Sequence, residues 1–190
     1  MNAIPQAPIV TPEEAAAIAR IAGMVVEGRA CGSCSLCCKV LDIPALEKPA
    51  GKWCSHCKPR NGCGIHAMRP VACRGFYCEW TISKGLGPEW KPERAKFLLA
   101  KTDEGRRMTA HVDPGLPGAW RASPYYENFK IWAAEGGRRN PMMMMAVMVG
   151  NRITVVLPDR DVEFGILEPG ERLQLLRDGN GLMSVDRIPA

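Results

Sequence analysis

The chain has 190 residues, of which 46% are hydrophobic, and a formal net charge of +5. This length can bury a core without disulfide staples, and the longest apolar stretches, near 15–26 and 142–149, are too short or carry a charge that excludes a membrane span. Residues 1–8 have no basic n-region and no uninterrupted apolar core, so they do not form a signal peptide, and we predict a cytoplasmic protein with no membrane partner.

The first predicted element is a helix that begins at Thr11. Thr11 is a typical N-cap, Pro12 suits the first helical position, and Glu14 completes a capping box. The helix should run to about Glu27 and end at Gly28. It leads the chain directly into a cysteine-rich segment.

All nine cysteines lie between Cys31 and Cys78, and His56 and His66 lie among them. Such clustering is typical of soft thiolates that converge on a metal. Two alternatives are a disulfide framework and inert buried thiols, but the odd number, one adjacent pair and the absence of a signal peptide argue against disulfides. The cysteines are Cys31, Cys34, Cys37, Cys38, Cys54, Cys57, Cys63, Cys73 and Cys78.

The spacing of these cysteines indicates two kinds of metal site. Cys31, Cys34 and Cys37 have the spacing of the first three ligands of a bacterial ferredoxin, so a fourth must come from further along the chain. Cys37 and Cys38 are adjacent, and we expect their side chains to diverge and to serve two neighbouring centres. Cys54-x2-Cys57 is a pair of the zinc-knuckle type. Because the segment is rich in Gly and Pro, it must be mostly loops, and a metal would supply its missing folding energy.

The net charge is concentrated in the same segment, where seven basic and two acidic residues lie between Cys31 and Cys78. A basic segment can neutralise nucleic-acid phosphates. A divalent metal with four thiolates is itself negative, however, so the basic residues can instead offset the charge of the site. We expect Arg69 and Arg74 to orient and neutralise the thiolates, and we keep nucleic-acid binding as the disfavoured alternative.

Beyond residue 88 the sequence predicts strands, with turn signals between them, and one helix over 124–135 that ends at Gly136-Gly137. The run Met142–Met145 is interpreted as a core strand and not as a copper site, and His111 as structural. The predicted strands are 95–101, 107–112, 143–149, 152–157, 162–167, 173–177 and 182–185. The fold class is α+β: residues 1–88 form the N-terminal helix and the metal-binding region, and 89–190 an antiparallel sheet with one or two helices, packed with the first region as one compact unit.

The cysteine motifs resemble a known family. Cys31-x2-Cys34-x2-Cys37-Cys38 is followed by Gly-Lys-Trp-Cys54 and then by Gly-Cys63-x-Ile-His66-x2-Arg69-Pro70-x2-Cys73-Arg74-x-Phe76-x-Cys78. This order is similar to that of the CxxCxxCC family of zinc- or iron-chelating proteins, the YkgJ-type cysteine-cluster proteins related to flagellin N-methylase. The resemblance covers about residues 30 to 80 and implies eight ligands, Cys31, Cys34, Cys37, Cys38, Cys54, Cys63, Cys73 and Cys78. Cys57 departs from the pattern, and His66 stands where the family often has an aromatic residue, which implies packing or support of the ligands instead of ligation. Cys57, His56 and His66 are further candidate ligands.

Three functions follow as expectations. The first is a metalloprotein whose iron–sulfur or iron centre performs redox or radical chemistry on an unknown protein or small-molecule substrate, because three thiolates have cluster spacing. The alternative is a structural zinc module that binds a protein or nucleic acid, because eight thiolates divide into two closed tetrahedral sites. The resemblance alone suggests a third, a protein-modifying transferase related to flagellin N-methylase. The sequence has no glycine-rich nucleotide loop and no recognisable catalytic triad.

Overall fold

The computed structural model describes residues 10–58 and 61–189, and its α+β fold class agrees with the prediction. Residues 1–8, which we predicted not to be a signal peptide, lie outside the described residues. The chain divides into two compact units, Met1–Leu98 and Leu99–Ala190, whereas the sequence suggested a boundary after residue 88. Within the described residues, no helix has both the length and the apolar character needed to cross a bilayer.

Helix α1 spans Pro12–Ala22 and begins as predicted. The Glu14 amide donates to Thr11 Oγ1 at 3.2 Å, and the Thr11 amide donates to Glu14 Oε2 at 2.9 Å, which completes the capping box. The helix ends several residues earlier than predicted, with Gly23 at its C-cap. The reason is tertiary, because the Val26 amide donates to the carbonyl of Thr81 at 3.0 Å and takes the chain away from the helical path.

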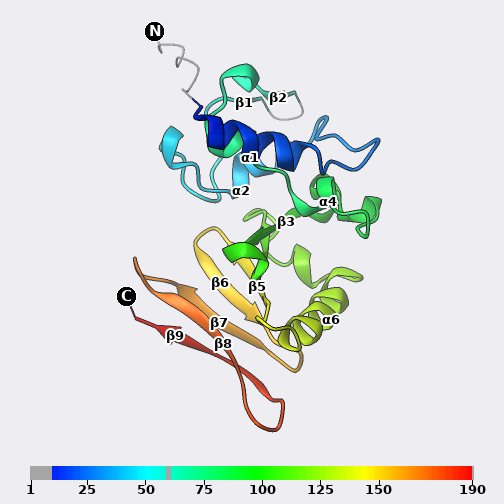
Figure 1. Cartoon of the computed structure of the whole chain (residues 1–190), viewed down its shortest axis with the longest axis vertical. Coiled ribbons are helices and arrows are strands. Elements are labelled where there is room, and N and C mark those ends of the chain that lie inside the picture. The colour runs from blue at the N-terminus through cyan, green and yellow to red at the C-terminus, as the bar shows by residue number, and fades with distance from the viewer. Residues whose placement is uncertain (1–9, 59–60, 190) are drawn as a thin grey trace. The chain divides into compact units, whose positions relative to one another are not determined.

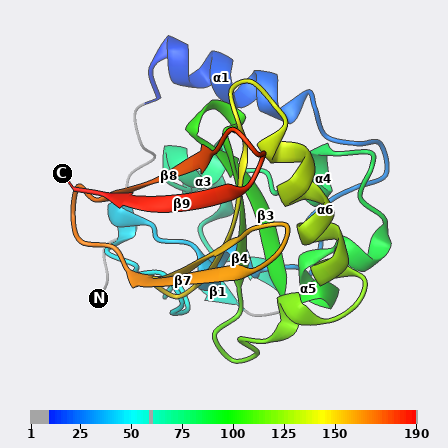
Figure 2. The same cartoon turned by 90° about the horizontal axis from the view of Figure 1, so that it is seen from below.

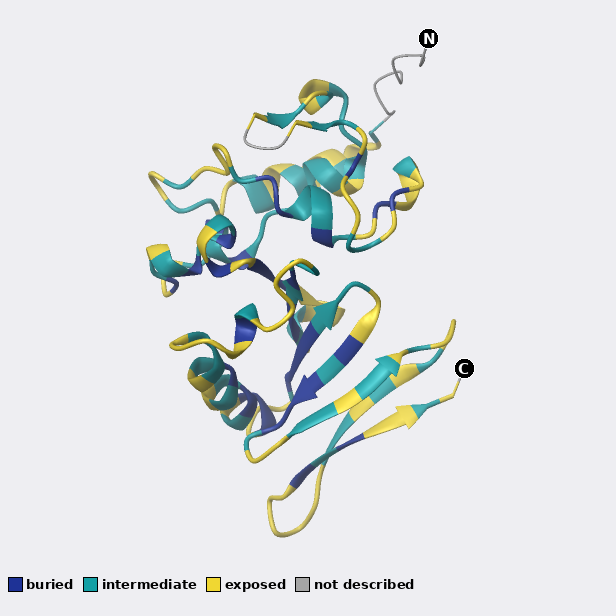
Figure 3. Ribbon diagram, turned by 180° about the vertical axis from the view of Figure 1, so that it is seen from behind, coloured by how far each residue is buried: buried dark blue, intermediate teal, exposed yellow. Residues whose placement is uncertain are grey.

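The rest of the first unit consists of elements two to four residues long joined by turns, as the Gly and Pro content predicted (Figure 1). Most of its side chains are half-buried or exposed, as the teal and yellow of Figure 3 show. The Arg29 guanidinium fastens one part of it by donating to the carbonyls of Trp80, Ser83 and Leu86. The elements are α2 (Cys37–Val40), η1 (Pro44–Leu46), β1 (Cys57–Lys58), β2 (Gly62–Cys63), η2 (His66–Met68), α3 (Val71–Arg74), α4 (Glu79–Ile82), η3 (Pro88–Trp90) and α5 (Pro92–Ala95).

The second unit is built on a five-stranded sheet with the order β3-β4-β5-β6-β7. Strands β5, β6 and β7 are antiparallel neighbours, but β4 and β5 are parallel, so the prediction of an antiparallel sheet is wrong at this pair. Parallel neighbours need a crossover connection, and helix α6 (Tyr125–Gly137) lies in that connection. The strands and short helices are β3 (Phe97–Thr102), η4 (Asp103–Gly105), β4 (Arg107–Val112), η5 (Ala119–Arg121), β5 (Met144–Val149), β6 (Arg152–Val156) and β7 (Asp161–Ile166).

The C-terminal hairpin of β8 (Arg172–Arg177) and β9 (Met183–Ile188) forms a separate two-stranded sheet. Figures 1 and 2 show it as a layer beside β7, and its Met183 and Val185 pack against Met144, Val155 and Leu157 of the larger sheet. The methionines of the run 143–145 are all buried, which agrees with their interpretation as a core strand.

Helix α6 packs beside β5 and β6 and buries Phe129 and Ala133. Gly136 and Gly137 do not end this helix as predicted but form its last turn. A Cβ added to Gly136 would overlap the carbonyl oxygen of Met143, and one added to Gly137 would overlap the sulfur of Met183. Gly136 is therefore needed for the close approach of the helix to a backbone carbonyl, whereas a side chain at Gly137 would displace the flexible end of Met183.

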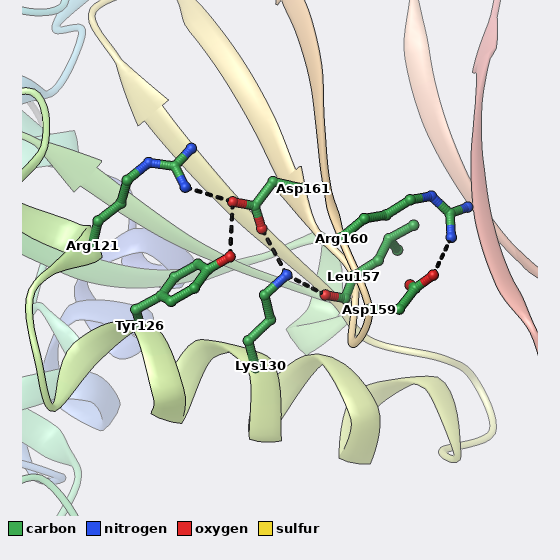
Figure 4. A network of polar contacts seen from close by, with 7 residues as sticks. All are labelled: Arg121, Tyr126, Lys130, Leu157, Asp159, Arg160 and Asp161. Atoms are coloured by element: carbon green, nitrogen blue, oxygen red, sulfur yellow. Dashed lines mark hydrogen bonds and ion pairs between the residues drawn. The ribbon is translucent and has the colours of Figure 1, made fainter.

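A half-buried carboxylate joins α6 to β7 (Figure 4). Asp161 accepts from Lys130 Nζ at 2.8 Å, from Arg121 Nη1 at 2.7 Å and from the Tyr126 hydroxyl at 3.1 Å. Lys130 also donates to the Leu157 carbonyl at 2.8 Å. Burial alone would raise the pKa of Asp161, but the hydrogen bonds from Lys130 and Arg121 lower it, so the charged form is retained.

Candidate metal centre

All nine cysteines are free thiols, and short local structures fix the position of each. The first turn is closed by the Cys34 amide, which donates to the Cys31 carbonyl at 2.8 Å. Cys37 and Cys38 are the first two residues of α2. Cys78 occupies the N-cap of α4, where its sulfur lies 3.2 Å from Thr81 Oγ1.

The next cysteines lie on a small antiparallel ribbon formed by β1 and β2. Cys57 stands directly opposite Cys63 in this ribbon, so the two side chains are on the same face. The Cys57 amide donates to the Cys54 carbonyl at 3.0 Å, which closes the Cys54-x2-Cys57 turn. The Cys54 amide donates to the Cys38 carbonyl at 2.9 Å, so this turn is fastened to α2.

Eight of the nine thiols are named as two groups of four, after the local structures that carry most of their members. The first, the turn group, is Cys31, Cys34, Cys37 and Cys78; the second, the ribbon group, is Cys54, Cys57, Cys63 and Cys73. In the turn group, the charge of Cys78 acts on Cys31 and Cys34. In the ribbon group, the charge of Cys38 acts on Cys73, and the charges of Cys54 and Cys63 do so more weakly. Cys38 belongs to neither group alone, because it hydrogen-bonds to both Cys37 and Cys57.

The contact between Cys37 and Cys38 changes the proton affinity of both thiols. A hydrogen bond from Cys37 lowers the pKa of Cys38 to about 6, and the same bond raises the pKa of Cys37. Their side chains therefore meet and do not diverge as the sequence predicted. Burial raises the pKa of Cys57 to about 11, and burial also raises the pKa values of Cys31, Cys34 and Cys73. A metal that binds these thiols must displace their protons.

Basic groups close to the thiols include both predicted arginines. Burial raises the pKa values of Cys31 and Cys73, and the charge of Arg69 opposes this rise; the same charge helps to lower the pKa of Cys38. The Arg74 guanidinium donates to the carbonyls of Arg69 and Ala67, each at 2.8 Å. Arg74 therefore holds the backbone that carries Arg69, and these two contacts are with carbonyl oxygens and not with sulfur.

Lys48 is a further basic residue of the site that the sequence did not single out. Its side chain is buried, and Nζ donates to the carbonyls of Lys39, at 2.9 Å, and Leu41. Burial lowers the pKa of Lys48, whereas the thiolate charges of Cys54 and Cys38 raise it. The excess of basic residues in the segment was the only sequence signal for this role.

The two histidines have different surroundings from the thiols. His66 is exposed in η2, where its carbonyl accepts from Arg69 Nε at 3.0 Å. The carbonyl of His56 accepts from the Gly64 amide at 2.8 Å and helps to close the ribbon. Over 10–58 and 61–189, no three His, Cys, Asp or Glu side chains are arranged to hold a metal ion. The nine thiols suit a thiophilic metal by their chemistry. The direct contacts between thiols described above join two cysteines at a time, Cys38 with Cys37 and Cys38 with Cys57.

Comparisons with known proteins find no relative of this chain. No family model, no curated protein and no solved structure matches the chain. The similarity to the CxxCxxCC proteins thus rests on the order and spacing of the cysteine motifs.

Proposed function

We propose that the chain is a metal-binding protein whose cysteine segment holds an iron–sulfur or iron centre that serves redox or radical chemistry on a protein or small-molecule substrate. The observation that carries this proposal is the gathering of nine free cysteines on short turns that backbone hydrogen bonds fasten together: the Cys54 amide is bonded to the Cys38 carbonyl, and Cys57 stands opposite Cys63. Thiols placed for core packing have no need to gather in one loop-rich segment, whereas ligands of a metal do.

The turn group supports iron. Cys31, Cys34 and Cys37 provide three thiols at ferredoxin spacing, and the remote Cys78 acts on two of the three. A remote fourth cysteine is usual for proteins that hold such clusters. When bound, a cluster of this kind would accept and release single electrons, and the protein would set its potential through burial and hydrogen bonds to sulfur. Thr81, whose hydroxyl lies beside the Cys78 sulfur, is one such hydrogen-bonding group.

The ribbon group supports a second candidate, a structural zinc module that binds a protein or nucleic acid. A Cys-x2-Cys turn followed by a short hairpin is typical of zinc knuckles, and four thiolates close a tetrahedral site. The basic residues favour a protein partner over nucleic acid. Lys48 and Arg74 donate to backbone carbonyls, and Arg69 acts on thiols, so these charges already have a role inside the site.

The same thiol chemistry supports the cytoplasm as the compartment. Reducing conditions there keep cysteines free for metals, whereas oxidising compartments favour disulfides. A cysteine segment with nine free thiols suits the former.

The deciding experiment combines elemental analysis with the visible spectrum of protein purified without oxygen. Iron together with broad visible absorption that bleaches on reduction supports the redox proposal. Colourless protein with about two zinc ions per chain contradicts it and supports the zinc module. Absence of any stoichiometric metal, also after anaerobic reconstitution with iron and sulfide or with zinc, contradicts both candidates.

A further inference from the structure

A cavity of about 250 Å³ is formed entirely by residues of the second unit. Its walls come from the loop that contains η5, from the end of β5 and from the neighbouring strands β6 and β7. Pockets that hold drug-sized ligands have volumes of about 300–1,000 Å³, so this one suits a smaller molecule. The proposed metal centre uses none of these residues.

One wall of the cavity is aromatic and held in place. Trp120 is buried, and the Arg121 guanidinium lies 4.0 Å from the centroid of its ring. Arg121 Nη1 also donates to Asp161 at 2.7 Å, as Figure 4 shows. These contacts fix the guanidinium, and Asp161 neutralises its charge. Because a guanidinium carries five N–H groups, the bond to Asp161 does not exhaust its donors.

A β-bulge lies at the wall that β6 and β7 form. Ile153 pairs with Gly165, but Thr154 pairs with Glu163, so Phe164 has no partner on β6. Gly165 has a φ of +68°, a conformation that favours glycine. Both Gly165 and Glu163 line the cavity. Bulges of this kind redirect side chains and are common beside binding sites.

Two opposite charges line the cavity without pairing. Arg152 lies two residues before Thr154 on β6, and Thr154 stands opposite Glu163 on β7, so the two charged residues are diagonal neighbours. Long side chains at such positions are within reach of each other. Among residues 10–58 and 61–189, however, neither side chain has an ion-pair partner. One positive and one negative group are therefore available to a ligand.

These charges select the class of ligand. A molecule with a carboxylate alone would be attracted by Arg152 and repelled by Glu163, and a molecule with an ammonium group alone would meet the reverse. A molecule that carries both groups satisfies both side chains. The remaining wall is apolar, because Pro117, Val149 and the Trp120 ring contribute to it, so it can accept an apolar side chain.

We propose that this cavity binds a free α-amino acid with an apolar side chain, whose carboxylate contacts Arg152 and whose ammonium group contacts Glu163. The Thr154 hydroxyl and the Arg121 guanidinium also line the cavity and supply further donors for the carboxylate. This site goes beyond the proposed metal-binding function and does not depend on it.

The test is isothermal titration calorimetry of the full-length protein with three probes. L-leucine carries both charged groups, isocaproate has the same carbon skeleton without the amino group, and isoamylamine lacks the carboxylate. L-leucine should bind about ten-fold more tightly than either of the others, because each charge-assisted hydrogen bond contributes about a factor of ten or more.

Charge-removing variants assign the two ends of the ligand. Arg152→Gln should weaken the binding of L-leucine about ten-fold and strengthen that of isoamylamine, because the repelling cation is gone. Glu163→Gln should weaken L-leucine by a similar factor and strengthen isocaproate. A variant that had lost its fold could not gain affinity for a probe. Arg172→Gln and Glu127→Gln, at exposed positions of β8 and α6, are the matched controls and should bind all three probes as the wild type does.

Several results would overturn the inference. They are the absence of L-leucine binding at millimolar concentration, equal affinity of the wild type for the three probes, and unchanged affinities in both cavity variants. Tighter binding of isocaproate than of L-leucine would show a site for simple anions and would also contradict the proposal. None of these outcomes bears on the metal content, which is measured separately.

Discussion

Each of the two units is stabilised internally by different physical means. The second buries large apolar side chains almost completely, among them Phe129, Met145 and Val155, while in the segment from Cys31 to Cys78 the described apolar residues that are buried are few. These are Leu36, Val40, Ile43 and Cys54. Burial of apolar surface contributes roughly 25 cal/mol per Å², so the second unit draws on a source of stability that the cysteine segment largely lacks. The cysteine segment is therefore the part of the chain whose stability would gain most from the proposed metal.

Polar contacts take the place of a core in the cysteine segment. Lys48 and Arg74 each donate to two backbone carbonyls and so connect turns that have no sheet or long helix to join them. A net contribution of about 1 kcal/mol per hydrogen bond is small compared with the entropy of ordering such loops. Metal–thiolate bonds are the remaining source of stability in the proposal.

The largest expected effect is that of removing the metal. A chelator under reducing conditions should abolish the amide-exchange protection of α2, β1 and α3, whereas β4, β5 and β6 should keep theirs. Binding energies of structural zinc reach about 10–16 kcal/mol in small peptides, which exceeds the stability of most domains. Exchange monitored by mass spectrometry measures both units in one sample. Equal protection with and without metal would contradict the proposed dependence of the cysteine segment on metal.

The second prediction concerns the apolar core of the second unit, from which one large side chain is removed. Phe129 is fully buried in α6 and stacks on Trp120, so Phe129→Ala should lower the free energy of unfolding of this unit by about 3–5 kcal/mol. Denaturant unfolding measures the change, and Ile131→Ala, at an exposed position of the same helix, is the matched control. Metal content should not fall in either variant. A parallel loss of metal would show that the two units are coupled.

Acid should weaken the second unit through His111. Burial, followed by the charge of Arg107, lowers the pKa of this histidine to about 4. Because the pKa is near 6.5 when unfolded, stability is fully present above about pH 6.5 and declines as the pH falls towards 4, by about 2–3 kcal/mol. Unfolding of the wild type and of His111→Gln at several pH values should show a steeper decline in the wild type. An identical decline in both would assign the acid sensitivity to other groups.

The smallest expected effect concerns the hydrogen bonds around the thiols. Arg74→Ala removes two donors to the carbonyls of Arg69 and Ala67, so Arg69 should lose its fixed position near the thiols. Metal affinity should fall about ten-fold, as is typical when groups that orient ligands are removed. Competition with a chromogenic chelator measures it, with Lys52→Ala at an exposed site as control. If metal affinity stayed constant while binding to RNA or DNA disappeared, Arg74 would instead be part of a nucleic-acid surface.

Local signals were enough to predict several elements of the fold. The capping box of Thr11 and Glu14 is present as predicted, because its two hydrogen bonds join residues three apart. The Gly150-Asn151 turn between β5 and β6 is likewise a property of neighbouring residues. The metal-site candidates were recognised in the same way, from cysteine spacing over a few residues.

Contacts between distant residues decided the rest. The early end of α1 depends on a hydrogen bond to Thr81. The parallel pairing of β4 with β5 depends on the path of α6 between them. Gly136 is needed because the carbonyl of Met143 lies against it. The position of Cys57 opposite Cys63 likewise follows from strand pairing and not from spacing. The helix start, the hairpin turn and the candidate thiol ligands can be predicted from sequence, because each depends on residues within a few positions of one another. The neighbours of each thiol and each strand can be known only from the tertiary structure, because strand pairing and burial depend on the packing of a whole unit.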